Sequence, residues 1–296
     1  MAEEDRTPGA DDGEATILVG VDGSEHSRLA VKWAADEAVA RRATIWVVYA
    51  GPGAPKDVPA WYDEGPHEEP AAQAVLDDAV GLVVARHPRL TVRRERFKDI
   101  PAVALVGASA QADLLVVGAR GVGRLKRLLV GSVSEQCMDH ALCPVVIVRP
   151  GFQEESASKG TPRVVVGIDG SRGSEHALRW ALREGRVRGA SVEGVFSWQY
   201  PPSHAIGADS AAKLESWARE VTQSASSIAE GSEPAVSFTA SARFDATVIG
   251  LLDASEDADL LVVGARGHGG YLDSLLGSIA RQCALYATCS VVIVRP

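Results

Sequence analysis

Three glycines and a serine recur at a fixed spacing, and these residues are the best suited in the chain to hold a ligand. The pattern G-x-x-G-x9-G-S occurs at Gly118, Gly121, Gly131 and Ser132, and again at Gly264, Gly267, Gly277 and Ser278. Glycines let another group approach the backbone closely, and exposed amides in such a loop form a nest for an anion. A helix that begins at the serine adds the partial positive charge of its N-terminus. The pattern favours a phosphate-binding loop in each half, and the alternative is that the glycines only permit turns.

A second candidate loop follows the first apolar run of each half. Its members are Gly20, Asp22, Gly23 and Ser24, repeated as Gly167, Asp169, Gly170 and Ser171. Asp22 or Ser24 can cap the helix that follows, and Gly23 permits the turn, so capping alone would explain this motif. In the glycine loop, Ser132-x-x-Glu135 predicts a capping box.

Other catalytic and metal-binding patterns do not occur in the sequence. Neither G-x-x-x-x-G-K-[ST] nor G-x-S-x-G is found, and the order of Gly118, Gly121 and Gly123 reverses the dinucleotide fingerprint. The acidic residues offer no pair that would anchor general acid–base chemistry. The cysteines stand in two pairs: Cys137 with Cys143, and Cys283 with Cys289. Their spacing and the scattered histidines do not suit a metal, so we expect buried free thiols.

The sequence contains an internal repeat of about half its length. ILVGVDGS at residues 17–24 returns as VVVGIDGS at 164–171, an offset of 147, and ADLLVVGARG at 112–121 returns at 258–267, an offset of 146. Phe97 matches Phe244 at the larger offset, which places the lost residue after this pair. A period of this size predicts a duplicated domain. We expect a disordered acidic tail at 1–14, domains at 15–150 and 163–296, and a linker at 151–162.

Short apolar runs alternate with helical patterns inside each unit. In the first unit the strands are predicted at 17–22, 44–50, 90–97, 114–118 and 144–149, and the helices at 24–41, 71–86, 102–110 and 132–140. This alternation predicts an α/β fold of two tandem doubly wound domains, each a five-stranded parallel sheet sandwiched by helices. The fifth strands would be edges, and we expect them to pair between the two copies or between chains.

Composition and charge narrow the partners. The chain has 296 residues, 46% hydrophobic and 23% charged, with a formal net charge of −9, which disfavours nucleic acid as a partner. No apolar run approaches the roughly 20 residues of a transmembrane helix, and the acidic N-terminus resembles no targeting peptide, so a cytoplasmic protein without membrane contact is expected. Residues 51–70 form a long Pro- and acid-rich connection, either a solvated excursion or a lid.

The strand-D-G-S opening, the glycine loop and the closing run CPVVIVR at 143–149 together resemble the universal stress protein family. The resemblance covers nearly the whole chain, and tandem members of this kind are typical of actinobacteria. It implies a five-stranded parallel sheet in each half and, for members with this glycine pattern, ATP bound by the loop. The sequence departs from the family at Lys98-Asp99-Ile100-Pro101, at Asp245-Ala246-Thr247 and at Ser290, which stands where the first half has Pro144.

The resemblance also implies which residues contact ATP. Asp22 and Asp169, beside Gly20 and Gly167, would contact the adenosine, and main-chain atoms of Ala50 and Ser197 would face the adenine. The remaining contacts would come from the glycine loops: Gly118, Ala119, Arg120, Gly121, Val122, Gly123, Arg124, Gly131, Ser132 and Val133, and then Gly264, Ala265, Arg266, Gly267, His268, Gly269, Gly270, Gly277, Ser278 and Ile279. Mg²⁺ would arrive with the nucleotide, held partly by Asp22 or Asp169.

The two loops differ in charge. The first carries Arg120, Arg124, Lys126 and Arg127, and the second carries Arg266, His268 and Asp273. If these side chains face the ligand, a triphosphate prefers the first loop, so two sites of unequal affinity are predicted.

These observations favour a nucleotide-binding regulatory or stress-response protein, an intramolecular pseudo-dimer of two domains that could also form a homodimer. Fast catalysis is not expected, because no base for water and no acidic pair committed to Mg²⁺ is found. Two other functions stay open: a protein-interaction module that binds no nucleotide, and a slow ATPase or phosphotransferase.

Overall fold

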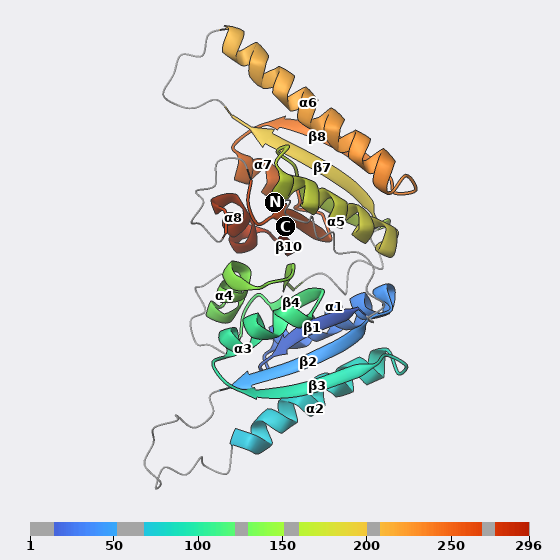
Figure 1. Cartoon of the computed structure of the whole chain (residues 1–296), viewed down its shortest axis with the longest axis vertical. Helices are drawn as coiled ribbons and strands as arrows, with labels where there is room; N and C mark the ends of the chain where they lie inside the picture. The colour runs from blue at the N-terminus through green and yellow to red at the C-terminus, as the bar shows by residue number, and fades with distance from the viewer. Residues whose placement is uncertain are drawn as a thin grey trace, which may run out of the picture.

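Ten strands form one continuous sheet in the order β3-β2-β1-β4-β5-β10-β9-β6-β7-β8 (Figure 1). The structure is a computed structural model that describes residues 15–51, 68–121, 130–150, 160–199, 208–267 and 276–295. The strands of the first half are β1 (Thr16–Val21), β2 (Thr44–Gly51), β3 (Val92–Lys98), β4 (Leu114–Gly118) and β5 (Val145–Val148). Those of the second half are β6 (Arg163–Gly167), β7 (Ser191–Trp198), β8 (Phe238–Phe244), β9 (Leu260–Gly264) and β10 (Ser290–Val294).

Each half is a parallel sheet, as predicted, and the fifth strands join the halves. β5 and β10 pair antiparallel, with Val146 opposite Val292. This pairing confirms the expected contact between copies, and it satisfies hydrogen-bonding groups that two separate edges would leave open. The outer edges of the sheet are β3 and β8, and β3 carries the charged run VRRERFK, which discourages pairing with another chain.

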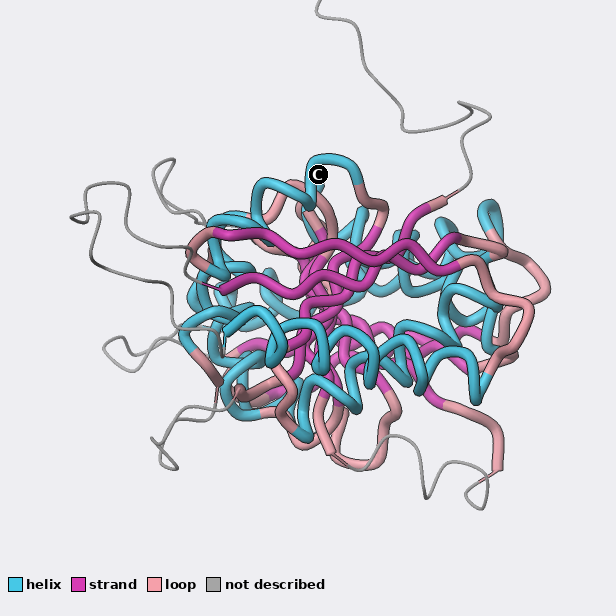
Figure 2. The backbone as a smooth tube through the Cα atoms, turned by 90° about the horizontal axis from the view of Figure 1, so that it is seen from below, coloured by secondary structure: helices cyan, strands magenta, loops and turns pink. Residues whose placement is uncertain are grey.

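Helices cover both faces of the sheet (Figure 2). They are α1 (Glu25–Arg41), α2 (Glu68–Arg86), α3 (Pro101–Ala108) and α4 (Ser132–His140), then α5 (Arg172–Arg188), α6 (Ala208–Ser232), α7 (Thr247–Ala254) and α8 (Ser278–Tyr286). The helices α1, α2, α5 and α6 pack in one apolar core, and α3, α4, α7 and α8 pack in the other, on the opposite face. Because the central strands are covered on both faces, β4 reads LLVVG with every residue buried.

The register of the outer strands corrects one detail of the repeat. Phe97 lies opposite Ala50, whereas Phe244 lies opposite Trp198. Since Ala50 corresponds to Ser197, whose partner is Arg243, the residue lost from the second copy precedes β8, and the match of Phe97 with Phe244 was wrong. A shift of one residue turns a side chain to the other face of a sheet. Accordingly Phe97 packs near Trp46, whereas Phe244 is 61% exposed and contacts Trp198.

The joint between the halves is reciprocal on both faces of the sheet. On one face Arg41 bonds Glu37 of its own helix and Glu184 of the other half, and Arg188 bonds Glu184 and Glu37 in the same way. On the opposite face Arg149 donates to the carbonyls of Ala284 and Leu285 near the end of α8, and Arg295 donates to the carbonyl of Met138 near the end of α4. Each domain therefore contributes arginine side chains that bond carboxylates and backbone carbonyls of the other domain.

Some predicted segments lie outside the described residues. These are the tail at 1–14, most of the connection at 51–70, most of its counterpart near 199–210, and most of the linker at 151–162. The described part of α2 begins at Glu68, three residues before the predicted start. Within the described ranges, no helix is long and apolar enough to span a membrane.

Candidate functional site

The strand order brings the two candidate loops of each half together. Within the first half the connection changes direction between β1 and β4, which are neighbours in the sheet. Ligands of open parallel sheets bind at such a switch point, beyond the C-terminal ends of the strands. The loop after β1 contains Asp22, and the loop after β4 contains Gly118 and Gly121. The second half repeats this arrangement at β6 and β9.

The loop after β1 is ordered by its own side chains. The Asp22 Oδ1 accepts from the backbone N of Ser24 at 3.0 Å, and the Ser24 Oγ caps α1 by accepting from the N of Ser27 at 3.1 Å. Gly23 has a φ of +80°, in the region that favours glycine. In the second half Ser171 caps α5 in the same way and Gly170 has a φ of +78°. The capping and turn predictions are confirmed in both halves.

Two of the three glycines in each glycine loop are explained by the protein itself. A Cβ on Gly118 would lie 2.7 Å from the backbone carbonyl of His26, in the first turn of α1. A Cβ on Gly264 would lie 2.6 Å from the carbonyl oxygen of Gly173. Gly121 and Gly267 face the carboxylates of the aspartates after β1 and β6, which a Cβ would strike. Gly118 and Gly264 need glycine because the backbone of a helix start packs against them, and a side chain at Gly121 or Gly267 would displace the aspartate carboxylate.

The third glycine has no such close neighbour among the described residues. Gly131 has a φ of −78°, which any residue adopts, and a Cβ there would meet nothing closer than 3.6 Å. Gly277 is similar, with a φ of −67° and a closest distance of 3.3 Å to the Ala265 carbonyl oxygen. Neither the backbone conformation nor a severe clash requires glycine at these two positions. Among the described residues, a Cβ on Gly131 would make only ordinary van der Waals contacts, and one on Gly277 would make a tighter contact.

The helix starts at these glycines present free amides. Gly131 is the N-cap of α4, its own N–H donates to the Ala119 carbonyl at 2.8 Å, and it has no side-chain capping bond. The capping box predicted at Ser132 was therefore wrong: Ser132 is the first helical residue, and Glu135 pairs with Arg281 at 2.8 Å. Within the described part of the chain, the amides of Ser132 and Val133 have no acceptor, as expected for a helix N-terminus.

The second half is built in the same way. The N–H of Gly277 donates to the Ala265 carbonyl at 2.8 Å, and α8 follows at Ser278 with Ile279 next. These starts are where the partial positive charge of a helix N-terminus would meet a phosphate.

The strand ends expected to face the adenine differ between the halves. Ala50 is half-buried near the end of β2, whereas the carbonyl of Ser197 accepts from the Thr247 Oγ1 at 3.1 Å. The Ser197 Oγ donates to the Asp245 carbonyl at 3.1 Å. The main chain of the second half is thus already partly engaged at this point.

Several predicted contacts lie outside the described residues: Val122, Gly123 and Arg124 in the first loop, and His268, Gly269 and Gly270 in the second. Lys126, Arg127 and Asp273 lie outside them too. Of the loop charges, Arg120 is half-buried and Arg266 is exposed. The predicted charge difference between the two sites stays a prediction.

The cysteines are free, and three of the four are buried. Burial raises the pKa of Cys137, Cys143 and Cys283 to about 12, and that of Cys289 to about 11. Such thiols stay protonated near neutral pH, so they are poor nucleophiles and poor metal ligands. The described residues hold no cluster of His, Cys, Asp and Glu suited to a metal ion.

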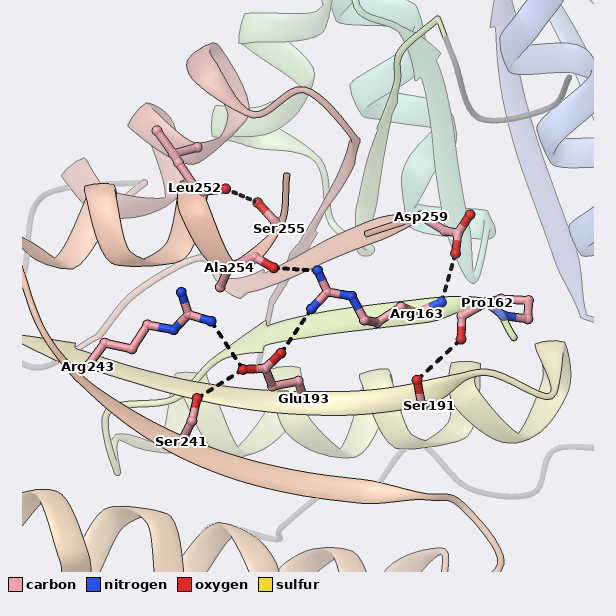
Figure 3. A network of polar contacts seen from close by, with 10 residues as sticks. All are labelled: Pro162, Arg163, Ser191, Glu193, Ser241, Arg243, Leu252, Ala254, Ser255 and Asp259. Atoms are coloured by element: carbon pink, nitrogen blue, oxygen red, sulfur yellow. Dashed lines mark hydrogen bonds and ion pairs between the residues drawn. The ribbon is translucent and has the colours of Figure 1, made fainter. Parts of the chain in front are cut away.

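A polar network in the second half takes the place of an aromatic contact in the first. Arg163 binds Glu193 at 2.9 Å and the Ala254 carbonyl at 2.8 Å, while Ser241 and Arg243 also reach Glu193 (Figure 3). Glu193 corresponds to Trp46, which carries Arg93 over its ring at 3.8 Å. The network was not predicted, because residue spacing within β7 says nothing about partners on β6, on β8 and at the end of α7. It lies away from the glycine loops and is structural.

A surface cavity of about 510 Å³ also lies away from the loops. Its lining includes Arg42, Arg86, His87 and Thr91, which precede β2 and β3. Since these residues precede the strands, the cavity lies at the N-terminal ends of β2 and β3, whereas the switch point lies at the C-terminal ends of the strands. The cavity is therefore separate from the candidate site.

Comparison with known proteins gives one consistent result. The sequence profile of the universal stress protein family matches residues 15–149 and 160–295. A universal stress protein of Mycolicibacterium smegmatis is 33% identical over 303 residues, covering 96% of this chain and 98% of its own. One of Mycobacterium tuberculosis is 33% identical over 293 residues, covering 94% and 96%. The crystal structure of a universal stress protein from Archaeoglobus fulgidus covers 95% of this chain and 98% of its own with a TM-score of 0.67, and at 19% identity it shows the fold alone.

Proposed function

Because the chain belongs to the universal stress protein family, with two family domains in tandem, we propose that it binds ATP at both glycine loops and that occupancy regulates conformation or association. The domains are taken as 15–150 and 163–296, joined by the linker at 151–162, with five strands on each side. Association with a second chain, as a homodimer, is one output that occupancy could control.

One observation carries this proposal: Gly131, where the described residues would accept a Cβ without a clash, stands at the start of α4, which has no side-chain capping bond. A phosphate seated there would accept from the amides of Ser132 and Val133, which have no acceptor in the described part of the chain. The second half repeats this chemistry at Gly277, Ser278 and Ile279. A glycine that neither the conformation nor a severe clash requires is explained by a ligand that needs the room.

The rest of the site fits a nucleotide around that phosphate. Asp22 lies beside Gly121 at the same switch point, which supports a contact of its carboxylate with the ribose or with a nucleotide-bound Mg²⁺. The end of β2 at Ala50 lies on the far side of β1 and would face the adenine. Arg120 precedes Gly121, and its guanidinium would add a charge-assisted contact to the phosphates.

The test is the nucleotide that the protein carries. Freshly purified protein is denatured, and released nucleotide is identified by chromatography and mass and counted per chain. We expect about two ATP per wild-type chain, about one in Gly131→Asp or Gly277→Asp, and none in the double variant. Aspartate is a favoured N-cap residue, so each helix start is kept while the added charge repels phosphate. Gly81→Asp, in open space on α2, is the matched control and should retain both nucleotides.

Two outcomes would favour the other functions. A wild-type protein that releases no nucleotide and does not bind added Mg-ATP would contradict the proposal and favour a protein-interaction module. Phosphate release from the purified ATP complex, lost in the double variant, would show a slow ATPase or phosphotransferase acting at these same loops.

A further inference from the structure

The two glycine loops are anchored differently, although their glycines are spaced identically. In the first half the Ser134 Oγ donates a hydrogen bond of 2.7 Å to the Gly118 carbonyl, and the serine side chain is buried. Ser134 belongs to the first turn of α4, and Gly118 is the last residue of β4. This bond therefore ties the helix start to the strand end, the two elements that bracket the candidate phosphate site. The corresponding residue of the second half is Ala280, also buried, which has no hydroxyl to make the bond.

A second pair of equivalent serines shows the same asymmetry. The Oγ of Ser24 lies 3.5 Å from the carbonyl oxygen of Arg120 in the first glycine loop. Its equivalent, Ser171, donates its Oγ to the Oδ1 of Asp169 instead, at 2.5 Å, and makes no hydrogen bond to the described residues of the second loop. In the first loop, the Ser134 hydroxyl makes a short hydrogen bond and the Ser24 hydroxyl a long contact, and the described part of the second loop has neither.

The path of the second loop explains why the contacts differ. The Arg266 carbonyl lies so close to Gly173, in the first turn of α5, that a Cβ on this glycine would strike it. The first half has His26 at that position, and its Cβ keeps the loop away from α1. The two loops thus rest differently on their neighbouring helices because of a His-to-Gly difference.

We infer that Ser134 is a positioning residue that preorganises the first nucleotide site, and that Ala280 leaves the second site less ordered and weaker. The inference rests on the proposed function. The Ser134 bond fixes the Gly118 peptide relative to the amides of Ser132 and Val133, so the strand end and the helix start are already in position when a phosphate arrives. In the second half that ordering occurs on binding and lowers the affinity. This difference is independent of the loop charges.

The experiment measures Mg-ATP affinity by calorimetry with one site at a time. Gly277→Asp leaves the first site, and Gly131→Asp leaves the second. In the first background Ser134→Ala should raise Kd by about 3–10-fold, the value of one hydrogen bond, and Ser134→Thr should restore the affinity. In the second background Ala280→Ser should lower Kd by about threefold. A gain of affinity at the second site cannot come from damaged folding, so this variant keeps the test valid if Ser134→Ala is unstable.

The outcomes separate the two proposals. Ordinary ATP binding with no change on Ser134→Ala and no gain on Ala280→Ser would overturn the role of Ser134 and leave the nucleotide proposal standing. A second site tighter than the first would also overturn it. Absence of Mg-ATP binding in wild-type protein would remove the proposed function, and the role of Ser134 with it.

Discussion

At the scale of single residues, Gly118 and Gly131 stand at the two ends of one loop but have different neighbours. Gly118 is enclosed by the backbone of α1, whereas a Cβ on Gly131, at the start of α4, would make only ordinary contacts with the described residues. The distinction separates a glycine that the fold needs from one whose role we propose to be ligand binding. The sequence pattern alone cannot make it, since both positions read as the same letter.

This distinction predicts opposite effects of two small substitutions. Gly118→Ala should lower the free energy of unfolding by about 1–3 kcal/mol, because its Cβ would lie 2.7 Å from the His26 backbone. Gly131→Ser should change it by less than about 0.5 kcal/mol, since serine is a good N-cap residue, yet should weaken ATP binding. Urea unfolding and ATP titration of both variants measure this. Equal destabilisation by both would show that Gly131 is also enclosed.

At the scale of elements, the two kinds of helix start use their serines differently. Ser24 accepts from the N of Ser27 and is a true N-cap of α1, whereas Ser132 is already helical and Gly131 stands at the cap. The first start is closed by the serine side chain, and the second has no side-chain capping bond.

Serine-to-alanine changes should separate these starts. Ser24→Ala is expected to cost about 1 kcal/mol of unfolding free energy, because one amide of the first turn loses its acceptor. Ser132→Ala should cost less than about 0.5 kcal/mol, because no capping bond is lost. Thermal and urea unfolding in the absence of nucleotide measure both. A cost at Ser132 as large as that at Ser24 would restore the capping box that the geometry rejects.

Most elements were predictable from sequence because burial on both faces leaves an unbroken apolar run, as in LLVVG at 114–118 and 260–264. The helix start at Ser132 was predicted, but its cap was not. In the sequence Gly131-Ser132 either residue can be the N-cap, and the structure has Gly131 there. The lost residue before β8 was misplaced because a phenylalanine stood by chance at the expected offset. The candidate glycines were found from spacing, whereas the Ser134 contact depends on packing between elements.

At the scale of the whole molecule, the repeat becomes a pseudo-symmetric joint. Glu37, Arg41 and Trp33 return at an offset of 147 as Glu184, Arg188 and Trp180. In the joint Arg41 lies over the Trp180 ring at 5.3 Å and Arg188 over the Trp33 ring at 4.7 Å. The repetition of these residues is visible in the sequence. Their contact across the joint is not, because it depends on how β5 and β10 pair.

The joint contains a buried carboxyl group that is hard to ionise. Burial, and then the neighbouring Glu184, raise the pKa of Glu37 to about 7, while Arg188 and Arg41 only partly oppose them. Glu184 faces both arginines, which lower its pKa. The pair of glutamates therefore shares a proton up to about neutral pH, with Glu37 as its carrier.

This proton predicts how stability depends on pH. The folded pKa of Glu37 lies above the ordinary carboxyl value, so between about pH 4.5 and 7 the folded state binds more protons than the unfolded state. The resulting stabilisation is fully present below that range and is lost as pH rises through it. Glu37→Gln cannot titrate, so its unfolding free energy relative to wild type should improve by about 1–2 kcal/mol between pH 5.5 and 8.

Urea unfolding of wild type and Glu37→Gln at several pH values gives this difference directly. The quantity that decides is the change of the difference with pH, because the amide also alters the hydrogen bonds to Arg41 and Arg188 by an amount that does not depend on pH. Glu230→Gln, an exposed change on α6, is the control and should track wild type. A difference that stays flat would mean that Glu37 is ionised throughout, with its charge held by the two arginines of the joint.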